Sequence, residues 1–184
     1  CADVTGVQTC ALPISTGDIN GDGLEDFVIG GAKDQSTAFY FQNSNGSFSQ
    51  RSFYFSSSHS KYEDMDMILN DFDSDGDLDL YIVSGGNEFE PNSPILKDRI
   101  YVNDGRGYFS YSENSVPNNY SSGMRVSSED FDKDGDLDFV LSGTNKENDN
   151  YHTISTFLNV RSESAIASSL PNDYNENNIN WKSI

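Results

Sequence analysis

The chain has 184 residues and a formal net charge of -19, from 11 Lys and Arg against 30 Asp and Glu. That charge excludes nucleic acid and anionic membrane surfaces as favourable partners and points to cations instead. No apolar run approaches the roughly 18 residues that a membrane-spanning helix needs, so we expect no membrane span. Segments 18–26, 71–79 and 130–138 hold 14 of the 30 acidic residues, which concentrates the negative charge in three short stretches.

The first residues need separate treatment. The run VTGVQTCALPI, from Val4 to Ile14, looks like the translation of a sequencing-library adapter. We therefore expect residues 1–14 to be a non-native segment and take residues 15–184 as the folding unit. Both cysteines, Cys1 and Cys10, lie in the excluded segment, so they say nothing about disulfides or redox compartment.

Three similar segments recur in the rest of the chain: GDINGDGLEDFVIGG from Gly17, NDFDSDGDLDLYIVSGG from Asn70 and EDFDKDGDLDFVLSG from Glu129. Their first aspartates are spaced 53 and 59 residues apart, which indicates a repeated supersecondary unit. Each acidic stretch runs into a short apolar segment that soon meets glycine. This pattern predicts buried strands at 27–29, 80–83 and 139–141.

Further strands follow in chain order. A second strand is predicted at 37–41 and at 99–102, each leading into a hairpin signal, Asn45-Gly46 and Asn103-Asp104-Gly105. Residues 86–98 are interpreted as an insertion, 153–158 as a strand, and 161–178 as a long loop. No segment has sustained helical periodicity. The sequence thus predicts an all-β chain of three units with about four strands each, at about 15–61, 62–120 and 121–184.

The acidic boxes fit Asp-x-Asp/Asn-x-Asp-Gly-x-x-Asp, in which alternating side-chain oxygens converge on one point as the loop curls. The sixth-place glycine supplies the sharp turn, and the seventh residue offers its main-chain carbonyl. Oxygen-only ligation favours Ca²⁺ over zinc or copper. The predicted calcium ligands are Asp18, Asn20, Asp22, Leu24 and Asp26 in the first loop, Asp71, Asp73, Asp75, Asp77 and Asp79 in the second, and Asp130, Asp132, Asp134, Asp136 and Asp138 in the third.

An EF-hand or dockerin loop begins in the same way. It requires an acidic residue at the twelfth place and a helix on each side. The twelfth places here are Ile29, Ile82 and Leu141, inside β-type runs, so the helical interpretation fails.

These boxes resemble the FG-GAP/VCBS repeats of integrin-α-like propellers. The stretches YEDMDMILNDFDSDGDLDLYIVSGGNEF and DRIYVNDGRGYF are similar to bacterial VCBS-repeat proteins related to cartilage acidic protein. The resemblance covers roughly residues 16–143. It implies a seven-bladed β-propeller of which this chain is a part, secretion or surface display, calcium in the blade loops, and adhesion to or recognition of an extracellular protein or glycan. The signature Ile29-Gly30-Gly31-Ala32 is degenerate, and the match fades beyond Thr144.

Catalysis is not expected. The two histidines, His59 and His152, lie in polar stretches and are interpreted as surface-loop residues, and the box aspartates are committed to metal. Trp181 fits either a core position or a ligand-stacking platform. Some propellers with such loops are polysaccharide lyases, which stays the alternative. The spacing also predicts a fourth box just beyond Ile184, with residues 178–184 as the strand leading into it.

Overall fold

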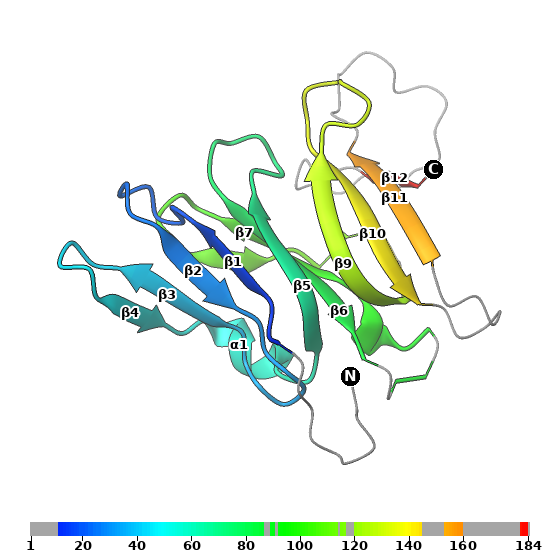
Figure 1. Ribbon diagram of the computed structural model, residues 1–184, viewed down its shortest axis with the longest axis horizontal. Helices are drawn as coiled ribbons and strands as arrows, with labels where there is room; N and C mark the ends of the chain where they lie inside the picture. Colours follow the sequence, from blue (N-terminus) through cyan, green and yellow to red (C-terminus); the bar gives the residue numbers. More distant parts are fainter. Residues whose placement is uncertain are drawn as a thin grey trace.

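A computed structural model describes residues 11–86, 89–90, 92–113, 115–116, 120–144, 153–159 and 181–183, the last two segments by their backbone. Three four-stranded antiparallel sheets stand side by side along the chain (Figure 1). Each sheet keeps its strands in chain order, so each repeat is an antiparallel meander. The all-β prediction with four strands per unit is therefore confirmed for these segments.

The first sheet contains β1 (Ile14–Gly17), β2 (Asp26–Ile29), β3 (Ala38–Gln42) and β4 (Phe48–Arg51). The second contains β5 (Glu63–Asn70), β6 (Asp79–Gly85), β7 (Arg99–Asn103) and β8 (Phe109–Tyr111). The third contains β9 (Ser122–Glu129), β10 (Asp138–Thr144), β11 (Thr153–Asn159) and β12 (Trp181–Ser183). The first two units thus end in the hairpins that the Asn-Gly and Asn-Asp-Gly signals predict.

Two differences from the sequence prediction concern short elements. A helix, α1 (Tyr54–His59), and a 3-10 turn, η1 (Pro94–Leu96), occur where no helix is predicted, because elements of six and three residues are too short to show helical periodicity. The sequence predicts residues 178–184 as the lead-in strand of a further box. Residues 181–183 instead pair with β11 and complete the third sheet, so that interpretation is wrong for them.

Alternation along each strand places two apolar clusters between the sheets. In β6, Leu80 and Ile82 face the first sheet, whereas Tyr81 and Val83 face the third. Every residue of this strand is buried, because the second sheet is covered on both faces. The first cluster also takes in Phe55 of α1, which fixes the helix against the sheets.

A bulge in the first strand of the second sheet changes which residues face which neighbour. Asp64 pairs with Ser84 and Asp66 with Val83, so Met65 has no partner across the ladder. Residues two apart normally share a face of a strand. The extra residue turns Asp64 towards the first sheet and Asp66 towards the third, as their hydrogen bonds show. The same shift occurs in the third sheet, where Gly123 and Arg125 flank an unpaired Met124.

Candidate metal loops and the polar contacts between the sheets

The acidic boxes form the turns that join the first two strands of each sheet, and the three turns lie along one edge of the molecule (Figure 1). They share one backbone conformation. The fourth residue has a positive φ in every loop, 72° at Gly21, 62° at Ser74 and 65° at Lys133. The sixth residue is glycine with φ of 83°, 96° and 95° at Gly23, Gly76 and Gly135. A Cβ at any of these three glycines would meet no atom within 4 Å, so the dihedral angle and not crowding requires glycine there.

The first aspartate of each box organises its turn by accepting two main-chain hydrogen bonds. In the second loop, Asp71 accepts from the N–H groups of Asp75 at 3.1 Å and Gly76 at 3.0 Å. The first and third loops repeat this pair of contacts through Asp18 and Asp130. The main chain of each turn therefore curls around the carboxylate of its first aspartate.

The ninth aspartate is a buried anchor as well as a predicted ligand. Asp26, Asp79 and Asp138 are 1%, 0% and 0% exposed. One oxygen of Asp79 accepts from the N–H of Phe72 in the same loop at 3.1 Å, and the other accepts from Asn103 at the end of β7 at 2.9 Å. Asp26 makes the equivalent pair of contacts in the first unit. This carboxylate thus ties the loop to the third strand of its own sheet.

Three carboxylates converge in each of two loops. Ligand oxygens of the first, third and ninth residues lie within 4.8 Å of one another in the groups Asp71, Asp73, Asp79 and Asp130, Asp132, Asp138. These groups could hold a metal ion. The first loop has the same turn, with the amide of Asn20 at the third place accepting the same main-chain contact.

The fifth-place aspartates are not members of these two groups, although the carboxyls of Asp75 and Asp134 lie next to those of Asp73 and Asp132. Asp22, Asp75 and Asp134 each accept a hydrogen bond from the N–H of the seventh residue of their own loop. Those seventh residues are Leu24, Asp77 and Asp136, whose carbonyls are the predicted main-chain ligands. The fifth carboxylate therefore holds the peptide of the seventh residue, and Asp22, Asp75 and Asp134 are all exposed.

Negative charge is crowded and partly buried in these loops. Burial, more than repulsion from Asp73, raises the pKa of Asp79 to about 7. Burial and the neighbouring Asp134 carboxyl raise the pKa of Asp136 to about 7. No hydrogen-bond donor among the described residues reaches either carboxyl oxygen of Asp136. A bound cation would offset both the burial of these carboxylates and the repulsion between them, because its positive charge stabilises carboxylates that water cannot solvate.

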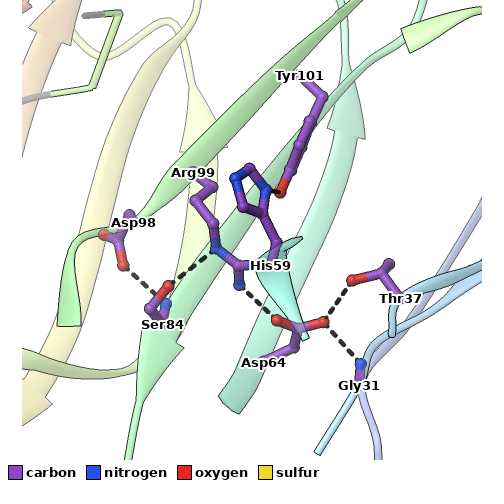
Figure 2. A network of polar contacts seen from close by, with 8 residues as sticks. All are labelled: Gly31, Thr37, His59, Asp64, Ser84, Asp98, Arg99 and Tyr101. Carbon is purple, nitrogen blue, oxygen red and sulfur yellow. Dashed lines mark hydrogen bonds and ion pairs between the residues drawn. The ribbon is translucent and has the colours of Figure 1, made fainter. Parts of the chain in front are cut away.

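Between the first and second sheets lies a buried polar network that the sequence pattern does not predict (Figure 2). Asp64 accepts hydrogen bonds from the main chain of Gly31 at 2.6 Å and from the hydroxyl of Thr37 at 2.8 Å, both in the first unit. Its other oxygen forms an ion pair with Arg99 of β7. Acidic residues inside the otherwise apolar stretch EDMDMIL are the signal that could have revealed this role.

Arg99 extends the same network within the second sheet. Its Nε donates to the hydroxyl of Ser84 at 3.2 Å, and its guanidinium lies 4.4 Å from the ring centre of Tyr62. Asp98 accepts from the main-chain N–H of Ser84 and from the hydroxyl of Tyr81, each at 2.8 Å. Burial raises the pKa of Asp98 to about 7 in spite of these two donors.

The prediction for His59 is wrong. It ends α1 and is half-buried, with its ring 4.6 Å from Tyr111 and its Nδ1 2.7 Å from the hydroxyl oxygen of Tyr101. Burial, followed by the positive charge of Arg99, lowers its pKa to about 4, so the ring is neutral at physiological pH. His152 lies outside the described residues, and so does the side chain of Trp181.

Repeated four-stranded sheets, each carrying the same acidic turn between its first two strands, define a β-repeat protein with candidate cation loops. The chain belongs to the FG-GAP-like repeat family. The family model matches residues 18–82 and again 71–141, and each match begins at the first aspartate of a box. No curated protein matches the chain. Within the described residues, no helix has both the length and the apolar character needed to cross a membrane.

Proposed function

We propose that this chain is a calcium-binding module of an extracellular β-propeller that recognises a protein or glycan, with calcium in a structural role and no catalytic activity of its own. The observation that carries the proposal is the convergence of three carboxylates, from the first, third and ninth residues, in two loops that share positive φ angles at their fourth and sixth residues. The first loop shares that backbone and offers Asn20 at the third place.

The donor set favours calcium among the common cations. Every side-chain donor is an oxygen, which suits a hard cation. Magnesium requires near-ideal octahedral geometry and keeps several waters, whereas calcium accepts six to eight oxygens in flexible arrangements. Carboxylates, an amide and a main-chain carbonyl from one short turn match the flexible coordination of calcium better than the octahedral coordination of magnesium. Dissociation constants of about 0.1–1 mM are usual for extracellular calcium modules.

A partly exposed apolar face of the first sheet supports the propeller. The second sheet packs one of its faces against the first sheet, and strand pairing shows which face of the first sheet is equivalent to it. The equivalent residues are Phe27 and Leu80, Tyr40 and Tyr101, and Phe48 and Phe109. On the first sheet Phe27 stacks on Tyr40 at 4.7 Å, and Phe48 is 45% exposed. A further sheet of the same kind would cover this face as the first sheet covers the second, which is how a propeller packs its blades.

The chemistry of the polar groups supports binding rather than catalysis. His59 packs against tyrosine rings, and the buried carboxylates Asp64 and Asp98 already accept two or more hydrogen bonds each. They join strands and sheets. A module of this kind offers a rigid frame whose loops present a recognition surface.

The test is the calcium stoichiometry of the full chain after removal of metal, measured by calorimetric titration with calcium chloride. We expect three ions, and one fewer in each of Asp73→Ala and Asp132→Ala, which remove one member of a carboxylate group. The matched control is Glu25→Ala, because Glu25 is an exposed acid inside the first box at a place that supplies no predicted ligand. No calcium-dependent heat in the unchanged chain, or an unchanged count in both aspartate variants, would contradict the proposal.

A further inference from the structure

Asn103, the last residue of β7, lies at the contact between the first two metal loops. It is 4% exposed, and both polar atoms of its side chain form hydrogen bonds. Its main-chain N–H donates to the ninth aspartate of the second loop, Asp79, at 2.9 Å. Its side-chain amide donates to the carbonyl of Leu78, in the same loop, at 3.1 Å. Its side-chain oxygen accepts from the N–H of Asp104 at 2.9 Å, which fixes the orientation of the amide.

The same amide also reaches the first loop. It donates to the carbonyl of Ile19, the second residue of that loop, at 2.7 Å. The N–H of Ile19 in turn donates to the ninth aspartate of the first loop, Asp26, at 3.1 Å. A continuous series of hydrogen bonds thus joins Asp26 to Asp79 through two residues. Ile19 is 1% exposed and packs in the apolar cluster between the two sheets, so it cannot move independently of them.

We propose that Asn103 is a positioning residue that couples cation binding in the first loop to cation binding in the second, so that filling either loop raises the affinity of the other. This inference rests on the proposed function. An ion in the first loop fixes Asp26 and with it Ile19, whose carbonyl then holds the amide of Asn103. The amide in turn fixes the peptide of Leu78 and the main-chain donor to Asp79. The second loop is therefore ordered before its own ion arrives, and less conformational entropy is lost on binding.

A carboxamide recurs at the same register in each sheet. Gln42 in β3 also donates its main-chain N–H to the ninth aspartate of its own loop, at 2.8 Å. Strand pairing places Asn159 of β11 at the corresponding position in the third sheet. In the described residues the contact across two loops is made by Asn103, which is why the inference concerns the first and second loops.

The experiment measures calcium binding to the second loop with the first loop intact or emptied. The full chain carries Asp132→Ala throughout, so that two loops remain, and calorimetry with calcium chloride gives both dissociation constants. We expect Asn20→Ala, which empties the first loop, to weaken binding at the second loop by about five-fold or more, the lower end of typical coupling between sites. Adding Asn103→Ala should abolish that dependence, leaving the second-loop constant within about two-fold whether or not the first loop is filled.

Two controls make the outcome specific. Asn43→Ala removes an asparagine whose side chain bonds to Ser47 and Ser49 of its own hairpin, and it should leave the coupling intact. If Asn103→Ala does not fold, Asn103→Ser, which removes the same amide donor to Ile19 and keeps a polar side chain, takes its place. The reciprocal measurement tests the coupling itself. Asp73→Ala, with Asn103 present, must weaken the first loop by the same factor, because coupling between binding sites is reciprocal.

Two independent calcium constants in the parent chain, or equal coupling with and without Asn103, would overturn the inference while leaving the metal-binding function standing. Absence of any calcium binding by the unchanged chain would reject the function itself. A loss of stability in Asn103→Ala that is equal in calcium and in chelator, with coupling retained, would reduce Asn103 to a structural residue and would also overturn the inference.

Discussion

Replacing Asp64 by asparagine tests whether the buried network joins the first two sheets. The side chains of Asp64 and Arg99 are 2% and 1% exposed, so the substitution leaves a buried guanidinium without its counter-charge. Breaking one partner of a buried ion pair costs about 3–5 kcal/mol. Asparagine also offers one acceptor oxygen where Asp64 serves Gly31, Thr37 and Arg99 with two. We expect the free energy of unfolding to fall by about 3–5 kcal/mol.

The matched control lies two residues away on the same strand. Asp66 also joins two sheets, by accepting from the N–H of Val126 at 3.1 Å, but its charged partner Arg125 has a side chain that is 75% exposed. An exposed pair contributes about 0–1 kcal/mol and the main-chain hydrogen bond about 1 kcal/mol, so Asp66→Asn should cost at most about 2 kcal/mol.

Urea denaturation followed by circular dichroism, in about 2 mM calcium, measures both variants. The double variant Asp64→Asn with Arg99→Met should recover part of the loss, because it removes the stranded charge as well. Equal costs for Asp64→Asn and Asp66→Asn would refute the reasoning. So would a double variant less stable than Asp64→Asn alone, since the stranded charge would then not be the cause.

Three further predictions concern metal, pH and backbone strain. Calcium at about 2 mM should raise the thermal midpoint by more than about 5 °C over chelator, because a site with Kd of about 0.1 mM contributes about 1.8 kcal/mol; superimposable melting curves would contradict this. The pKa of Asp98 rises to about 7 on folding, so the folded chain binds this proton more tightly than the unfolded chain and loses stability as pH rises from about 4 to 7. Urea titrations in chelator at pH 5 and pH 8 should therefore show the wild type losing more stability than Asp98→Asn over that interval; parallel losses would exclude Asp98 as the cause. Gly76→Ala should cost about 1–2 kcal/mol through its φ of 96° alone, since its Cβ meets no neighbour, and an unchanged urea midpoint would contradict the strain argument.

The sequence by itself determined the repeat, the turn and the strands that follow it. The nine residues of a box contain both the sixth-place glycine and the carboxylates that the turn brings together, so the information is local. The hairpins after β3 and β7 are equally local, because Asn-Gly and Asn-Asp-Gly specify their turns within a few residues. The sequence does not predict α1, because a helix of six residues is too short to show a helical period.

Only the tertiary structure decided which neighbour each polar side chain serves. Simple alternation would place Asp64 and Asp66 on one face of β5, and the bulge at Met65 sends them to opposite sheets. Asn103 forms a hydrogen bond with Ile19, which is 84 residues away in the sequence, and Asp64 forms one with Gly31, which is 33 residues away. The alternation of apolar and polar residues shows which side chains share a face of a strand, but it does not show which element packs against that face. These contacts depend on how whole sheets pack, and that packing is settled by the combined burial of both apolar clusters rather than by any local run of residues.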